Sequence, residues 1–233
     1  MKLIRTFLLT VAMAITVAFA NAANPHFSLN VTITVTHAGG GIIISPDKLA
    51  RNYLMWEFVK NGTESYICRH VFVDGNDYYD DVPTQTFELQ ANTNVKLDVE
   101  GSVVKTYVNG TLIDTFTDTR RVLRNDSIGF YASNLNNEKQ IVAFDDVTAK
   151  RIADDGAETT YIDTDFSSNT KTYFDEKFVK VINGNPKLYL NPSSRTDIKV
   201  IVKYPYNNHD SEDYVKIDPM SDTWVTEDDL GRV

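Results

Sequence analysis

Carboxylates are the side chains of this sequence that could most readily do chemistry, and their spacing limits what they can do. Hydrolysis of a glycosidic bond needs two carboxyl groups on either side of that bond, about 5–10 Å apart. Glu57 has no second carboxylate in the strand-like stretch 56–60. Asp145 and Asp146 are adjacent, so on a strand they point to opposite faces. We therefore expect no catalytic pair, and interpret Glu57 as a single exposed residue of a strand.

An acidic stretch follows the apolar residues that end at Val73. Asp74, Asn76 and Asp77 place hard oxygen ligands close together, with Asp80 and Asp81 just behind them. Calcium is the metal that such oxygens favour, although the spacing is not that of an EF-hand. A solvated acidic turn explains the same residues. Both interpretations stay open, and no other cofactor is expected.

Aromatic side chains could bind sugars, because a flat ring stacks on the apolar C–H face of a sugar. Alternation puts Trp56 on the same face as Leu54 and Phe58, which also fits a place in the core. Tyr78 and Tyr79, in the acidic stretch, are the better exposed pair. The candidates for carbohydrate binding are Tyr53, Trp56, Tyr78 and Tyr79.

Histidine and cysteine give no catalytic pattern. None of the four histidines has metal-ligand spacing to another, and no serine or cysteine lies in a nucleophile-elbow motif. Cys68 is the single cysteine, so no intramolecular disulfide can form. We expect Cys68 to pack as a small apolar residue on a strand.

The element with the clearest local signal is a hairpin over residues 104–116. Asn109–Gly110 separates two β-forming runs, and this pair accepts the positive φ angles of a type I′ turn. Val104, Thr106 and Val108 should lie on one face of the incoming strand, and Lys105 and Tyr107 on the other.

Short β-like runs separated by turn residues recur along the chain, with almost no helical periodicity. We predict a turn or bulge at Gly39–Gly41 and a turn at residues 74–77. This pattern is typical of an antiparallel sandwich. The strands are expected at 27–37, 42–44, 52–59, 65–73, 86–89, 94–99, 104–116, 127–132 and 140–149.

Three segments are predicted. Residues 1–22 read as a cleaved signal peptide: a basic start, an apolar run too short to span a bilayer, and Ala20-Asn21-Ala22 as the cleavage site. Residues 23–152 form the sandwich. Residues 153–233 form an extension or linker that does not fold alone, with some strand character at 161–190 and a linker-like stretch at 204–221.

Four motifs resemble a known family. NYLMWEF (52–58), VKTYVNGTLIDTF (104–116), SIGFYAS (127–133) and VAFDDVTAK (142–150) are similar, in order and spacing, to concanavalin A-like (laminin G/jelly-roll type) sandwich modules of bacterial glycoside hydrolases. Such modules precede the catalytic domain of α-L-rhamnosidases. Glu57 stands where the family pattern has Gln. Residues 222–232 resemble the segment leading into the catalytic barrel of some bacterial polysaccharide-degrading enzymes, so the chain could be the first part of an enzyme.

The resemblance and the composition together give the expected function. It is an exported, non-catalytic carbohydrate-associated module, secreted, periplasmic or on the cell surface, that binds glycan or supports a separate hydrolase. Loss of Lys2 and Arg5 with the signal peptide moves the net charge from −9 to about −11, which disfavours nucleic acid and anionic membranes as partners. The alternatives are a sandwich-fold glycoside hydrolase and a cell-surface adhesion domain.

Overall fold

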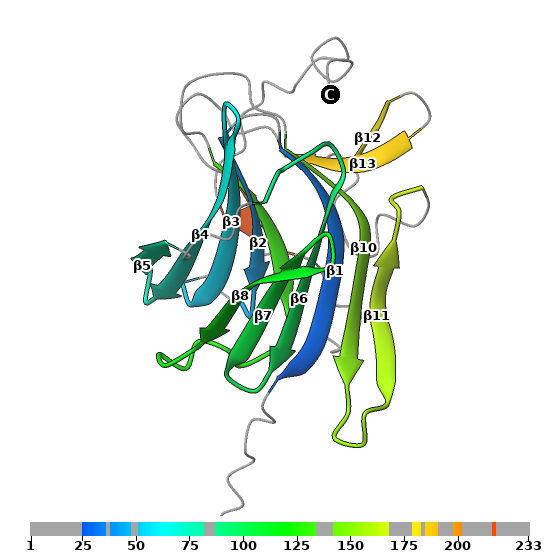
Figure 1. Cartoon of the computed structure of the whole chain (residues 1–233). Helices are drawn as coiled ribbons and strands as arrows, with labels where there is room; N and C mark the ends of the chain where they lie inside the picture. Colours follow the sequence, from blue (N-terminus) through cyan, green and yellow to red (C-terminus); the bar gives the residue numbers. More distant parts are fainter. Residues whose placement is uncertain are drawn as a thin grey trace, which may run out of the picture.

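The described part of the chain folds into two antiparallel sheets packed face to face (Figure 1). A computed structural model describes residues 25–35, 38–47, 51–81, 87–133, 142–167, 179–182, 185–190, 198–201 and 216–217. Sheet A has the order β12-β13-β10-β1-β6-β7-β8, and β11 also pairs with β10; sheet B has the order β15-β14-β9-β2-β3-β4-β5. The all-β antiparallel sandwich is confirmed.

The strands of sheet A are β1 (His26–Val35), β6 (Thr93–Glu100), β7 (Val103–Val108), β8 (Thr111–Thr117), β10 (Val142–Ile152), β11 (Glu158–Thr164), β12 (Val179–Ile182) and β13 (Asn185–Leu190). Those of sheet B are β2 (Ala38–Ile44), β3 (Tyr53–Asn61), β4 (Glu64–Val73), β5 (Asn76–Asp81), β9 (Ile128–Ala132), β14 (Ile198–Ile201) and β15 (Lys216–Ile217).

Alternation along the strands builds the core. Along most of β1 and β6, buried residues alternate with partly exposed ones, as expected of strands with one face toward a partner sheet. Burial of such apolar side chains is the main force that holds the two sheets together. The largest buried side chains of this inner layer are Trp56, Phe27, Phe58, Phe130 and Phe144.

The hairpin of β7 and β8 is confirmed, with one irregularity. Asn109 and Gly110 have φ angles of 47° and 79°, as a type I′ turn requires. The register shifts between Thr106, which pairs with Asp114, and Tyr107, which pairs with Leu112. Ile113 is therefore the extra residue of a bulge, and it is buried together with the adjacent Asp114.

Two sequence predictions about secondary structure are wrong. Gly39–Gly41 is no turn: it runs through the middle of β2. A Cβ on Gly40 would lie 2.6 Å from Val142 Cγ1 in the opposite sheet, so the absence of a side chain is what lets β2 pass there. Residues 87–89 are not a strand, although Leu89 is fully buried.

The expected edge of the sandwich at residue 153 falls in a tight turn between two paired strands. β11 pairs with β10 from Ile152–Glu158 to Val147–Thr164, β13 pairs with the start of β10, and β14 pairs with β9. The described strands of the extension thus continue both sheets. Residues 1–22, residues 222–232, and most of 204–221 lie outside the described residues.

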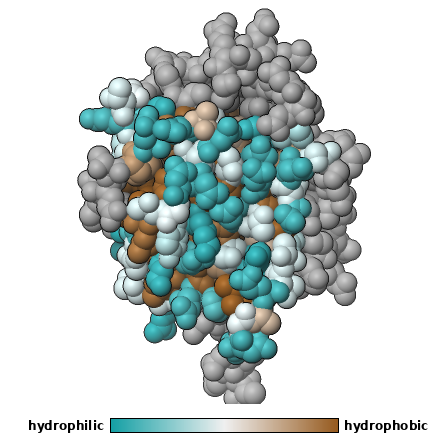
Figure 2. Space-filling view, turned by 45° about the vertical axis from the view of Figure 1, so that its right-hand side comes forward, coloured by the Kyte–Doolittle hydropathy of each residue, from teal (hydrophilic) through white to brown (hydrophobic). Residues whose placement is uncertain are grey.

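In the part of the chain that the structure describes, no helix is long and apolar enough to cross a membrane. With the β10–β11 side brought forward, the surface is mainly hydrophilic, with a few apolar residues between (Figure 2). This is the expected outer face of an antiparallel sheet whose inner face is packed.

Candidate functional site

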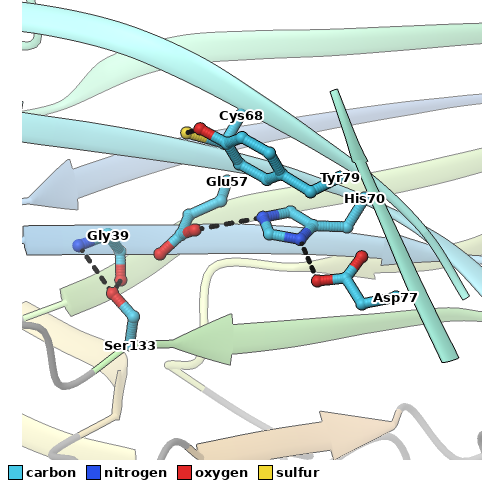
Figure 3. A network of polar contacts seen from close by, with 7 residues as sticks. All are labelled: Gly39, Glu57, Cys68, His70, Asp77, Tyr79 and Ser133. Atoms are coloured by element: carbon cyan, nitrogen blue, oxygen red, sulfur yellow. Dashed lines mark hydrogen bonds and ion pairs between the residues drawn. The ribbon is translucent and has the colours of Figure 1, made fainter. Parts of the chain in front are cut away.

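The outer face of sheet B gathers polar side chains from three neighbouring strands. Glu57 of β3, His70 of β4, and Asp77 and Tyr79 of β5 all point to this face (Figure 3). Register explains the grouping: β3 pairs Glu57 with Cys68, and β5 pairs Tyr79 with His70. His70 is therefore diagonal both to Glu57 and to Asp77, within reach of each.

His70 joins the two carboxylates. Its Nε2 lies 3.2 Å from Glu57 Oε2, and its Nδ1 lies 2.8 Å from Asp77 Oδ2 (Figure 3). Burial by itself lowers the pKa of His70, but the hydrogen bonds to Glu57 and Asp77 and their charges outweigh it, and the pKa is raised above its ordinary 6.5. An imidazolium donates from both nitrogens, which fits two carboxylate partners.

Glu57 is buried, so its interpretation as an exposed residue is wrong. Its side chain is 7% exposed. The reason is Gly39 on the adjacent strand β2: a Cβ there would lie 1.9 Å from Glu57 Oε1, so the carboxylate occupies space that any other residue would fill. In the part of the chain that the structure describes, Glu57 Oε1 has no hydrogen-bond partner, a costly state for a buried carboxylate oxygen.

Further contacts fix the borders of this cluster. Ser133, just after β9, accepts the N–H of Gly39 at 2.9 Å and anchors β2 from the other side. Cys68 lies buried on β4, as predicted, with its Sγ 3.3 Å from Tyr79 Oη. Tyr79 also meets His70 edge to face at 5.2 Å between ring centroids. The tyrosine ring is therefore held in place beside the imidazole.

Exposure rises from β3 toward the sheet edge at β5. The side chain of Asp77 is 37% exposed, and Tyr79 is 54% exposed. Tyr78 is also exposed, at 42%, but it points to the other face of the strand and lies under Arg120, whose Cζ is 3.8 Å from the ring centroid. Both tyrosines lie on β5 and not in a loop, so they do not form a common platform.

The two remaining aromatic candidates are buried. Trp56 is in the core, where its Nε1 donates to Asp114 Oδ2 at 3.2 Å. Tyr53 is stacked on Phe72, with ring centroids 4.2 Å apart. Both side chains are at most 1% exposed. Neither ring presents a face to a ligand in this structure, so as sugar platforms these two candidates are corrected to packing residues.

The acidic stretch forms the turn between β4 and β5 and contributes one carboxylate to the cluster. Asp74 takes the first position of the β4–β5 turn at a φ of 52°, and Asn76 Nδ2 donates to Val73 O at 3.4 Å. Asp77 holds His70. Among the described residues, no group of three or more histidine, cysteine or acidic side chains is arranged to hold a metal. The side chains of Asp80 and Asp81 are outside the described set.

The expectation that Asp145 and Asp146 point to opposite faces of β10 is wrong, because a bulge breaks the alternation between the buried Phe144 and Val147. Asp145 pairs with Thr32 of β1, and Asp146 Oδ2 accepts the hydroxyl of the same Thr32 at 3.3 Å. Asp146 is exposed, with a φ of 47°, at a bulge opposite Asn30 and Thr32. Asp145 is buried: it accepts the N–H of Asp146 at 2.9 Å and lies 3.5 Å from Lys187 Nζ. Burial raises the pKa of Asp145, against the lowering effect of those two donors. Both residues serve the fold of this strand.

Comparison with known proteins gives structural similarities only. No family model and no curated protein matches the chain. It is similar to the carbohydrate binding module CBM66 from Bacillus subtilis, with 17% identity, a TM-score of 0.44, and coverage of 54% of this chain and 74% of that one. It is also similar to the apo Crh5 transglycosylase, with 17% identity, a TM-score of 0.35, and coverage of 46% and 47%. Neither similarity assigns a function to this chain.

Proposed function

We propose that this chain is an exported, non-catalytic glycan-binding module, and that glycan contacts the outer face of sheet B at Tyr79, His70 and Asp77. The observation that carries the proposal is the exposed Tyr79 ring, held beside an oriented carboxylate–imidazole pair. Sugars need such a combination, because they present apolar C–H faces and hydroxyl groups at once.

The hydrogen-bonding part of the site is Asp77. Its Oδ2 is bonded to His70, and its Oδ1 has no partner among the described residues. A carboxylate fixed through one oxygen can accept a sugar hydroxyl with the other at little entropic cost. His70 holds Asp77 in this orientation, and Glu57 holds His70 from the buried side.

The same geometry supports a module without catalysis. Among the described side chains, Glu57 and Asp77 are the two carboxylates of the cluster, and the imidazole of His70 lies between them. A glycosidic bond would have to lie in that space to be flanked by an acid and a base. The two carboxylates therefore act as hydrogen-bond partners of one histidine.

The wider setting is also part of the proposal. The signal-like residues 1–22 and the single cysteine support export to an envelope or extracellular compartment. The four motifs that resemble hydrolase-associated sandwich modules support a place beside a polysaccharide hydrolase, on the same or another chain.

The test is isothermal titration calorimetry of the chain with a panel of soluble neutral polysaccharides. Tyr79→Ala should weaken binding about tenfold, since one aromatic contact contributes about 1 kcal/mol or more. The matched control is Tyr107→Ala, which removes a tyrosine from the outer face of sheet A. If Tyr79→Ala binds as tightly as the wild type, this site is wrong; if only proteins bind the chain, the adhesion alternative replaces it.

One observation favours the hydrolase alternative. Glu57 Oε1 is buried and has no hydrogen-bond partner among the described residues, and a catalytic role is one explanation of such an oxygen. Release of reducing sugar by the purified chain, abolished by Glu57→Gln, would establish that activity. If the chain is a non-catalytic module, neither the wild type nor Glu57→Gln releases reducing sugar.

A further inference from the structure

Three charged arginines are exposed just after β8. Arg120, Arg121 and Arg124 lie within five residues, and none of their guanidinium groups is paired with a carboxylate of the described chain. Two arginines of the strands differ: Arg69 pairs with Asp114, and Arg151 pairs with Asp126. We call Arg120, Arg121 and Arg124 the arginine patch.

The backbone under the arginine patch is held firmly. The buried Asp118 accepts the N–H groups of Arg120 and Leu123, at 3.0 and 2.8 Å. Ser45 Oγ, from the loop after β2, accepts the N–H of Arg124 at 2.7 Å. Val122 is buried between the arginines. The patch is therefore carried by a fixed backbone, which lowers the entropy lost when a ligand binds.

Arg121 adopts a backbone conformation that its side chain disfavours. Its φ is 58°, in the left-handed region that glycine and asparagine enter more easily. Its carbonyl accepts Arg124 Nε at 3.0 Å, so the turn also orients a second member of the patch. Residues held in such conformations cluster at binding sites, and here the strained residue is itself a cation.

Arg120 is oriented by an aromatic ring. Its guanidinium stacks over Tyr78 at 3.8 Å, which uses the face of the group. The N–H donors of a guanidinium lie in its plane, so stacking leaves them available. Tyr78 thus has a different role from Tyr79: it positions a cation on the opposite side of β5.

We infer that the arginine patch binds an anionic polysaccharide through its carboxylate or sulfate groups; this inference rests on the proposed glycan-binding function. Arginine bonds such anions in bidentate fashion, with charge-assisted hydrogen bonds. The negative net charge, about −11 without Lys2 and Arg5, disfavours anionic partners over the surface as a whole. Charges more than about 8 Å away are largely screened at physiological salt, so the local arginines determine binding at this site. The patch and the Tyr79 face then form two subsites, one for anionic groups and one for sugar rings.

The experiment measures binding of the whole chain to polygalacturonate, dextran sulfate and neutral dextran at two salt concentrations. The test variant carries Arg120→Gln, Arg121→Gln and Arg124→Gln. The control carries Lys96→Gln, Lys105→Gln and Lys150→Gln, which removes equal charge from the outer face of sheet A. We expect the test variant to lose about tenfold or more in affinity for the anionic polymers, and the control about twofold. Binding of polygalacturonate would indicate recognition of carboxylate groups, and binding of dextran sulfate would indicate recognition of sulfate groups.

The outcomes separate the two proposals. Equal binding by the test variant and the wild type overturns the arginine patch, as does binding of DNA or anionic vesicles in place of both anionic polymers. Binding of neutral dextran that Tyr79→Ala weakens, together with anionic polymers that bind no more tightly than neutral dextran, overturns the patch and keeps the proposed function. Binding of the anionic polymers that Tyr79→Ala leaves unchanged keeps the patch and overturns the Tyr79 site. If the triple variant does not fold by circular dichroism, Arg120→Gln alone should still cost about threefold.

Discussion

Two ionic clusters lie back to back on β3 and β4. Trp56 and Arg69 pair across the two strands and face inward, where Asp114 of β8 bonds to both. Glu57 and His70, one residue further along each strand, face outward and are bonded to each other. The inner cluster joins the two sheets, whereas the outer cluster joins three strands of one sheet and reaches the surface at Asp77.

The difference between the clusters shows how one pair of strands separates stability from recognition. In the inner cluster, Arg69 donates to both oxygens of Asp114 at 3.1 and 2.9 Å and stacks over Phe116 at 4.4 Å. A guanidinium stays charged at any pH that a protein meets. The outer cluster depends on a histidine, which titrates near neutral pH. We expect inner changes to affect stability and outer changes to affect binding and pH dependence.

The largest effect should come from the inner cluster. Asp114→Ala leaves the buried Arg69 without its carboxylate and Trp56 Nε1 without its acceptor. The free energy of unfolding should fall by about 3–5 kcal/mol, as when one partner of a buried ion pair is removed. Urea denaturation measures this. The control Asp98→Ala removes an ion pair with Lys96 on the exposed face of sheet A and should cost less than about 1 kcal/mol. Equal costs for both variants would mean that the inner cluster does not hold the sheets together.

An intermediate effect is expected where the outer cluster is packed against β2. Gly39→Ala places a methyl group on Glu57 Oε1 and should cost about 1–3 kcal/mol, the range for overpacking. Glu57→Ala makes room for that methyl group, so the double variant should be more stable than the sum of the single costs predicts. Strictly additive costs would show that Gly39 and Glu57 do not compete for the same space.

Local signals predicted much of this fold. The alternation of β1 and the Asn109–Gly110 turn depend on neighbouring residues only, and both are confirmed. The glycine run of β2 was misassigned, because glycine favours turns locally. Its place in a strand depends on Glu57 and Val142, which other strands bring near. The bulge at Ile113 depends likewise on cross-strand packing.

The candidate site was predictable in part. The Asp74–Gly75 turn fixes the register of β4 and β5, so the contact of His70 with Asp77 could have been found by counting back from that turn. The turn after Asn61 brings Glu57 beside His70 in the same way. The burial of Glu57 could not be predicted in this way, because Gly39, which leaves room for its carboxylate, lies on a third strand. The separation of Tyr78 from Tyr79 follows from alternation once residues 76–81 are assigned to a strand.

The smallest effect concerns the pH dependence of the outer cluster. The pKa of His70 is raised in the folded chain, so its charge stabilises the fold fully below the unfolded-state pKa of about 6.5. That stabilisation declines as the pH rises and is lost once the pH passes the raised pKa. The difference in unfolding free energy between the wild type and His70→Gln should therefore be largest near about pH 6 and shrink toward about pH 9, by less than the cost of Asp114→Ala. The control is His26→Gln, a histidine on β1 with no carboxylate bonded to it in the described chain. Its difference from the wild type should not follow this course. If the difference in unfolding free energy between the wild type and His70→Gln instead grows with pH, His70 is neutral in the folded chain. The inner and outer clusters would then not differ in the way described, since the outer one would carry no titrating charge.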